Sequence, residues 1–402
     1  MREELSEAHV GRRAAYAGAV LIGLNYAITA NYEIADPFHL AALVAGALAL
    51  LAIVRGWRLA GVAALVYVVI IGLHIHLGMP LNKGSDVLRV TDEAVNLLGA
   101  GQNPYSHYFF SSVPPGAPFR YFPGEIVFYD IWKALFGTVL TADRIAGAAI
   151  VLLFAAFAPL VGLEIAAITT ALYGTSALVV WRATDGSNDT TLALLIILAL
   201  WTLAAAQRLR ADSRLGRYLF AASAILFGWA LAFKLFAFFI FPYVIAYLRL
   251  AGWPWRRYLA YGAGTFLILT LPFFIWDPGG FARHTVLSQF YHQDIWGLNV
   301  WTVIRLVWPQ GADLIAPGIS FIQAAAVLYM FALTWRHAPR TLGRAVLGGC
   351  AVLLISFLFA NWTSSAYYSF LAAIVATGAI LALGRPQPAD NVAEPVAPST
   401  PP

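Results

Sequence analysis

The sequence has one cysteine, Cys350, only three lysines, and charged side chains at just 11% of its 402 positions. A single cysteine within an apolar run excludes a disulfide framework. So few charged residues together with 60% hydrophobic residues exclude a soluble globular protein, because the core of such a protein does not need that many apolar side chains. The net charge of +5 does not indicate nucleic-acid binding, because membrane topology explains the distribution of basic residues along the chain better.

Long apolar segments dominate what is present. Runs of about 16 to 20 apolar residues recur along the chain, which is the length that crosses a bilayer as a helix. The sequence therefore predicts an all-α polytopic membrane protein with one transmembrane domain over residues 1–384, followed by a disordered, Pro-rich tail over 385–402. Clear spans lie near 14–30, 39–54, 59–78, 190–206, 218–233, 235–249, 258–276, 318–334, 344–360 and 366–383.

The arginines predict the orientation. Arg-rich connections alternate with Arg-poor ones, and cytoplasmic loops collect Lys and Arg, so both termini are predicted to be cytoplasmic in the plasma membrane. This requires an even number of crossings in 125–181, where three apolar pieces are visible. The piece 166–181 contains polar residues and a glycine, and is predicted to be a broken helix. About twelve membrane helices result.

The predicted external loop 79–124 reads as organised rather than disordered. It holds three acids, Asp86, Asp92 and Glu93, on a short amphipathic helix, and it ends in a cluster of Pro, Tyr and Phe. Asp86 follows an apolar run at the depth of lipid headgroups, where a carboxylate is costly and indicates a functional site. Asp92 and Glu93 also fit a solvated helix face.

The other predicted external segments contain most of the remaining polar candidates. Lys234 interrupts a long apolar stretch, so it marks the tip of a helical hairpin. It is predicted either to bind phosphate or to extend its ammonium group to the membrane–water interface. Asp185 and Asp189 flank a polar turn before a span, where they serve either as helix cap and first-turn charge or as metal or substrate ligands. Further candidates are Tyr105, His107, Arg120, Tyr121, Arg182, Asn188, Arg283, His292, Trp362 and Tyr367.

The order of motifs resembles a known family. Asp86 precedes an Ala- and Leu-containing helix that runs to Gly101, then Asn103-Pro104-Tyr105, then Arg120-Tyr121-Phe122-Pro123 at the start of the next apolar segment. This order resembles the GT-C-fold glycosyltransferases that use polyprenyl-phosphate sugars, most of all the bacterial polyprenol-phosphate-mannose-dependent family, glycosyltransferase family 87. The sequence departs from the family at Val90, where a Tyr is usual, and in reading Tyr-Phe-Pro for Tyr-Pro-Pro.

The resemblance implies a GT-C-like fold and an inverting transfer of a hexose, mannose above others, or a pentose. The donor is a polyprenyl-phosphate sugar, and the acceptor is a lipid-linked or cell-envelope glycan at the extracytoplasmic face, within membrane lipids. Asp86 is the expected general base. The expected phosphate ligands are Lys234, Arg283, Arg182 and His292. The expected sugar or acceptor ligands are Asp92, Glu93, Tyr105, His107, Arg120, Tyr121, Asn188, Trp362 and Tyr367.

No cofactor is favoured, because protein cations can hold the phosphate. The acidic turn nevertheless resembles that of oligosaccharyltransferase catalytic subunits, so Mg²⁺ or Mn²⁺ on Asp185 and Asp189 is the alternative. Two other protein classes compete. A transporter or flippase has a similar span number, but places ionisable groups near the midplane and often shows repeats. A polysaccharide ligase or polymerase has a long external loop between late spans rather than an early one.

Overall fold

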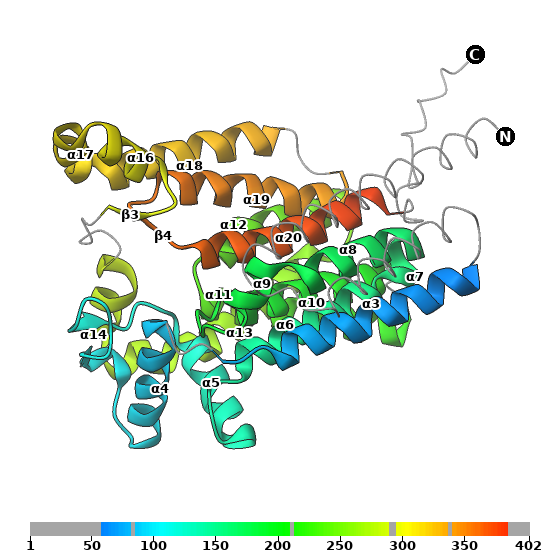
Figure 1. Cartoon of the computed structure of the whole chain (residues 1–402), viewed down its shortest axis with the longest axis horizontal. Helices are drawn as coiled ribbons and strands as arrows, with labels where there is room; N and C mark the ends of the chain where they lie inside the picture. The colour runs from blue at the N-terminus through cyan, green and yellow to red at the C-terminus, as the bar shows by residue number, and fades with distance from the viewer. Residues whose placement is uncertain (1–57, 82–84, 210–212, 289–294, 337–339, 385–402) are drawn as a thin grey trace, which may run out of the picture.

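The computed structural model describes residues 58–81, 85–209, 213–288, 295–336 and 340–384, and Figure 1 shows their arrangement. The spans predicted at 14–30 and 39–54, His292 and the tail 385–402 lie outside these residues. Within the described part, seven helices are long and apolar enough to cross a membrane, and three shorter helices are apolar. The chain is thus an all-α, multi-pass membrane protein.

The apolar helices run roughly along one direction as a bundle, and a second set of short elements gathers at one end of it (Figure 1). The bundle consists of α3 (Arg58–Gly78), α6 (Ala142–Ala156), α7 (Ala158–Val161), α8 (Leu163–Thr175), α9 (Ala177–Arg182), α10 (Asp189–Arg208), α11 (Arg214–Phe233), α12 (Ala237–Leu250), α13 (Trp255–Trp276), α18 (Ile319–Arg336), α19 (Leu342–Phe359) and α20 (Ser365–Leu383). The short elements are α4 (Asp86–Gly99), η1 (Pro104–Ser106), β1 (Tyr108–Phe109), β2 (Ala117–Pro118), α5 (Pro123–Phe136), α14 (Pro278–Phe281), η2 (Ala282–Leu287), β3 (Trp296–Gly297), α16 (Val300–Val307), α17 (Pro309–Ile315), η3 (Ala316–Gly318) and β4 (Trp362–Thr363).

Helix α10 is the centre of the bundle. It packs against α6, α11 and α20. Of its apolar stretch, 78% is buried inside the protein, whereas only 6% is buried for the apolar stretch that includes α18. Its side chains are apolar on all sides, as expected of a helix surrounded by others. Small residues allow close helix crossings elsewhere, since a Cβ on Gly343 of α19 would collide with the backbone of Ala382 on α20.

The segment 125–181 differs in part from the prediction. Residues 166–181 are indeed interrupted, because α8 ends at Thr175 and α9 begins at Ala177. However, α8 packs along α3 and α6 within the bundle, and the short apolar piece is α5 instead. Gly137, in the left-handed conformation, ends α5 after 14 residues. Lys133 of α5 pairs with Asp92 of α4 at 2.6 Å, which ties α5 to the loop.

The loop after α3 is folded, as its sequence predicts. Ser85 caps α4 by accepting a hydrogen bond from the Val87 N–H, and the apolar face of α4 is buried. An antiparallel pair, β1 with β2, closes the hairpin that follows. Phe109 and Phe119 are fully buried here and pack together, and both rings belong to the same hydrophobic core as the bundle helices.

The segments predicted to be external meet at one end of the bundle, which we call the loop end. The N–H of Ser85 donates to the carbonyl of Asp185, and Ser106 donates to Asp277 at 2.8 Å. Strand β3 pairs in parallel with β4, which joins the segment after α14 to the turn between α19 and α20. Loops that are far apart in sequence are therefore joined by hydrogen bonds at the loop end.

Candidate functional site

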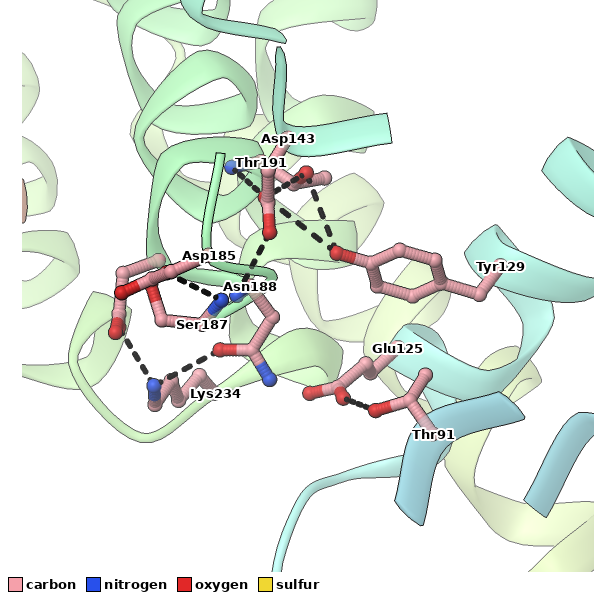
Figure 2. Close-up of polar contacts among 10 residues, drawn as sticks. Thr91, Glu125, Tyr129, Asp143, Asp185, Ser187, Asn188, Thr191 and Lys234 are labelled. Atoms are coloured by element: carbon pink, nitrogen blue, oxygen red, sulfur yellow. Dashed lines mark hydrogen bonds and ion pairs between the residues drawn. The ribbon is translucent and has the colours of Figure 1, made fainter. Parts of the chain in front are cut away.

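Lys234 lies at the centre of a buried cluster at the loop end. It follows the last residue of α11 in an extended conformation, and only 7% of its surface is exposed. Its Nζ donates to Oδ1 of Asn188 at 3.0 Å and lies 2.6 Å from Oδ1 of Asp189 (Figure 2). Burial opposes the charge of Lys234, but Asp189 and its acidic neighbours more than offset this, so the pKa of Lys234 is raised and the ammonium stays charged.

Three aromatic rings surround the same ammonium group. The Nζ of Lys234 lies 5.3 Å from the ring centroid of Tyr121, 4.8 Å from that of Phe236 and 5.0 Å from that of Tyr367. These distances are within the range of cation–π attraction. Tyr121 is held in place because its carbonyl accepts a hydrogen bond from the hydroxyl of Tyr105 at 2.7 Å.

Asp143 of α6 holds the turn that presents Asn188 and Asp189. Its carboxylate accepts from the N–H groups of Asn188, at 2.9 Å, and Thr191, at 3.0 Å, and from the Thr191 hydroxyl at 2.6 Å (Figure 2). Asn188 has a φ of 62°, the left-handed conformation that Asn tolerates better than most residues. Asp143 therefore caps the start of α10 by accepting from its first N–H groups. Asp189 does not cap the helix, and its carboxylate pairs with Lys234 instead.

Asp185 stabilises the same turn from the other side. Its Oδ1 accepts from the Ser187 N–H at 2.9 Å, and its Oδ2 pairs with Arg182. Arg182 also donates to the hydroxyl of Ser365 at the start of α20. Each acid of the turn thus has its own cation, Arg182 for Asp185 and Lys234 for Asp189. A metal bound between the two acids would have to compete with both ion pairs.

Asp86, the predicted base, is the first residue of α4 and is half-buried at the loop end. Its Oδ2 accepts from the N–H of Val113 at 2.7 Å, which orients the carboxylate. Burial, and the negative charges of several acids that include Asp86, raise the pKa of the Tyr121 hydroxyl.

Glu125 is a site residue that the sequence analysis missed. It lies in the first turn of α5, is fully buried, and accepts from the Thr91 hydroxyl at 2.8 Å (Figure 2). Burial raises the pKa of Glu125 to about 8, while the charge of Lys234 and the hydrogen bond from Thr91 act in the opposite direction. The available signal was a single acid in the apolar segment just after Phe122-Pro123.

The sequence matches no protein-family model and no curated protein. The structure does have neighbours among solved ones. It is similar to the crystal structure of ArnT from Cupriavidus metallidurans bound to undecaprenyl phosphate, with a TM-score of 0.50 and 18% identity over 81% of this chain and 60% of that one. For ArnT in the apo state the TM-score is 0.52, with 19% identity over 81% and 59% of the two chains. The chain has a GT-C fold. It spans about 60% of the length of ArnT.

Within this GT-C fold, the loop end brings together some of the residues expected to act on donor and acceptor. Tyr121 and Tyr367 lie around Lys234, Asn188 is hydrogen-bonded to it, and Asp86 lies at the same end of the bundle. The two residues of the metal alternative, Asp185 and Asp189, lie in the same turn, and the first of them pairs with Arg182.

Other predicted site residues take part in packing or surface pairs instead. Tyr105 is fully buried between Phe119 and Phe281, so its ring cannot stack on a sugar, and that prediction was wrong. Asp92 pairs with Lys133 at the surface, and Glu93 accepts from Ser111 at 2.7 Å. Both interactions fit the alternative of a solvated helix face.

The remaining candidates lie around the cluster rather than in it. Arg283 is exposed on η2, and its Nε donates to the carbonyl of Gly279 at 3.2 Å. The ring of Trp362 packs against that of Trp296 at a tilt of 31°, with the ring centroids 4.6 Å apart. His107, partly exposed, follows η1 in the loop. The roles assigned to these three residues from sequence stay predictions.

Proposed function

We propose that this protein is an inverting glycosyltransferase that moves a sugar from a polyprenyl phosphate to a lipid-linked or cell-envelope glycan. The observation that carries the proposal is the fold it shares with ArnT, whose crystal structure contains undecaprenyl phosphate. A partly exposed carboxylate, Asp86, and a buried cation, Lys234, both lie at the loop end and support it independently, because this transfer needs a base and a phosphate ligand.

The proposed reaction has one displacement step. The acceptor hydroxyl oxygen attacks the anomeric carbon, the bond between that carbon and the phosphate oxygen breaks, and polyprenyl phosphate leaves with the bonding electrons. Asp86 takes the proton of the acceptor hydroxyl as the new bond forms. The Val113 N–H on its other oxygen keeps the carboxylate oriented. One carboxylate is sufficient, since inversion requires no covalent intermediate.

The leaving phosphate is proposed to bind beside Lys234, with Arg182 as a second cation. Both cations are already paired with acids, so the phosphate would interact with them while those ion pairs remain. Tyr121 and Tyr367 lie around the ammonium and offer ring faces or hydroxyls to a sugar. Mannose as the sugar rests only on the resemblance to glycosyltransferase family 87. A location of the site at the extracytoplasmic face rests on that resemblance and on the distribution of arginines along the chain.

A transporter or flippase is the alternative, and the position of the ionisable groups argues against it. Asp86, Asp185 and Lys234 gather where helices begin and end, whereas transporters bind substrates and coupling ions near the middle of the membrane. A ligase or polymerase is less favoured, because the largest folded loop follows the early helix α3.

A reconstitution assay tests the proposal. The purified full-length protein in proteoliposomes is incubated with a panel of polyprenyl-phosphate sugars, each with a crude envelope-glycan acceptor, and released polyprenyl phosphate is measured by mass spectrometry. We expect release from one sugar donor and none from the others. Release from no donor, together with movement of intact lipid between leaflets in a fluorescent-lipid assay, would support the flippase.

A further inference from the structure

Glu125 has no role in the proposed reaction, although it lies near Lys234, the proposed phosphate ligand. It is inaccessible to solvent, with 0% of its surface exposed. Gly124 brings the start of α5 against α11, so close that an added Cβ would lie 2.5 Å from the carbonyl oxygen of Ala232. The carboxyl group is thereby held between α4 and the turn that presents Asn188 (Figure 2).

One hydrogen bond reaches the carboxyl group, since the Thr91 hydroxyl donates to Oε1 at 2.8 Å. The Asn188 amide faces the same carboxyl group without a hydrogen bond to it, and Nδ2 of Asn188 and Oε2 of Glu125 have no hydrogen-bond partner among the described residues. Because Asn188 Oδ1 accepts from Lys234, its Nδ2 is the atom that turns toward Glu125 (Figure 2). The Thr91 hydroxyl donates a hydrogen bond to the ionised carboxylate. It also accommodates the neutral acid, because a hydroxyl both donates and accepts, so Oε1–H can donate to Thr91 instead.

Glu125 has no ion-pair partner among the described residues, in contrast to Asp185 and Asp189. Lys234 influences it electrostatically but makes its close contacts with Asp189 and Asn188. The charged and titratable groups that interact with Glu125 across the packed elements are Lys234, Asp143, Tyr105, Tyr121 and Tyr129. With a pKa raised to about 8 by burial, Glu125 is mostly protonated at pH 7 and loses its proton as the pH rises through about 8.

We propose that Glu125 takes up a proton from solvent when a doubly charged phosphate group binds beside Lys234, and releases it when that group leaves. The inference rests on the proposed function and adds a regulatory residue to the same site. Glu125 thus influences phosphate binding through its own charge, by way of Asn188 and Lys234. It does not touch the reacting atoms.

The charge balance of the reaction explains why such a residue is useful. A polyprenyl-phosphate sugar is a phosphodiester with one negative charge, whereas the released polyprenyl phosphate is a monoester that carries nearly two above pH 7. The transfer puts the acceptor proton on Asp86 and therefore moves one negative charge from Asp86 to the phosphate beside Lys234, in a buried region where like charges raise each other's proton affinity. A proton on Glu125 compensates that charge, and the only bond that changes on Glu125 is its O–H bond.

Binding of undecaprenyl phosphate to the full-length protein in nanodiscs tests the inference. Calorimetry at pH 8 in two buffers of different ionisation enthalpy measures the protons taken up, and the Kd is measured from pH 7.5 to 9.5, where the ligand phosphate is already doubly charged. For the wild type we expect net proton uptake and a Kd that rises by up to about tenfold per pH unit above the pKa of the free protein. The affinity is highest below that pKa, because binding favours the protonated acid, and it is lost as the pH rises.

Glu125→Gln mimics the protonated acid, so it should bind without proton uptake and with a Kd that is independent of pH. Asp130→Asn, which removes an acid from the same helix α5, is the matched control and should behave as the wild type. Thr91→Val removes a donor to the ionised form, so it should move the weakening of binding to higher pH even if the Gln variant fails to fold. A flat Kd in the wild type, or proton uptake that persists in Glu125→Gln, overturns the inference. Absence of any binding by the wild type would instead remove the phosphate ligand from the proposed function.

Discussion

The ammonium of Lys234 and the carboxylate of Asp189 are 2.6 Å apart, and both side chains are almost completely buried. A pair of this kind is costly to desolvate and is strongly unfavourable to break, because a single unpaired charge then remains in a poorly solvated place. At the loop end it joins α11 to the start of α10, so the same contact bears on both folding and the proposed phosphate site.

Lys234→Met removes the charge and keeps the length of the side chain. We expect the free energy of unfolding to fall by about 3 to 5 kcal/mol, since Asp189 is left buried without its cation. Donor affinity should weaken while acceptor affinity holds. The double variant Lys234→Met/Asp189→Asn should recover much of the stability in thermal unfolding without recovering donor binding. Equal loss of donor and acceptor affinity would show that Lys234 is only structural.

Asp86→Asn keeps the size of the side chain and its hydrogen bond from Val113 but removes its basicity. Turnover should fall by roughly 10² to 10⁴ while the melting temperature stays near that of the wild type. Single-turnover rates with the donor identified in the panel assay provide the measurement. Near-normal turnover in this variant, with loss in Asp92→Asn or Glu93→Gln, would move the base to one of those acids.

Gly124→Ala tests whether the close approach of α5 and α11 positions the site. The added Cβ would lie 2.5 Å from the Ala232 carbonyl oxygen, so α5 must shift and carry Glu125 with it. We expect a loss of stability of about 1 to 3 kcal/mol, together with reduced turnover. Gly264→Ala on α13 is the control, because nothing lies within 4 Å of the corresponding Cβ. Equal unfolding temperatures for the two variants would contradict the packing argument.

Metal dependence is decided by chelation. Asp185 and Asp189 are paired with Arg182 and Lys234, and within the described residues no group of three or more His, Cys, Asp or Glu side chains could hold a metal. We expect turnover to survive exhaustive treatment with EDTA. Loss of activity that Mg²⁺ or Mn²⁺ restores would show that the ion pairs open to bind a metal, with these two acids as ligands.

Sequence reasoning located Lys234 and Asp86 because each is a charge in a place where charge is costly. Lys234 interrupts a long apolar stretch, and Asp86 follows an apolar run directly. In a membrane protein such positions stand out against a uniform apolar background. The same background made the helices predictable, since a spanning segment must satisfy its own backbone hydrogen bonds.

Glu125 and Asp143 are equally buried acids, yet their sequence context did not separate them from ordinary first-turn charges. Their roles depend on partners that are distant in the chain, Thr91 for the first and Asn188 with Thr191 for the second. Tyr105 shows the opposite error, because an aromatic residue in a loop motif suggested stacking on a sugar and the fold buried its ring.

The sequence by itself determined the membrane helices, the folded loop after α3 and the identity of the most exceptional charges, because these follow from hydrophobicity and local capping. Only the tertiary structure decided which charges meet: Lys234 with Asp189, Arg182 with Asp185, and Asp92 with Lys133 rather than with the cluster. The physical reason is that an ion pair depends on a few ångströms between side chains of different helices, and that separation is set by how the whole bundle packs.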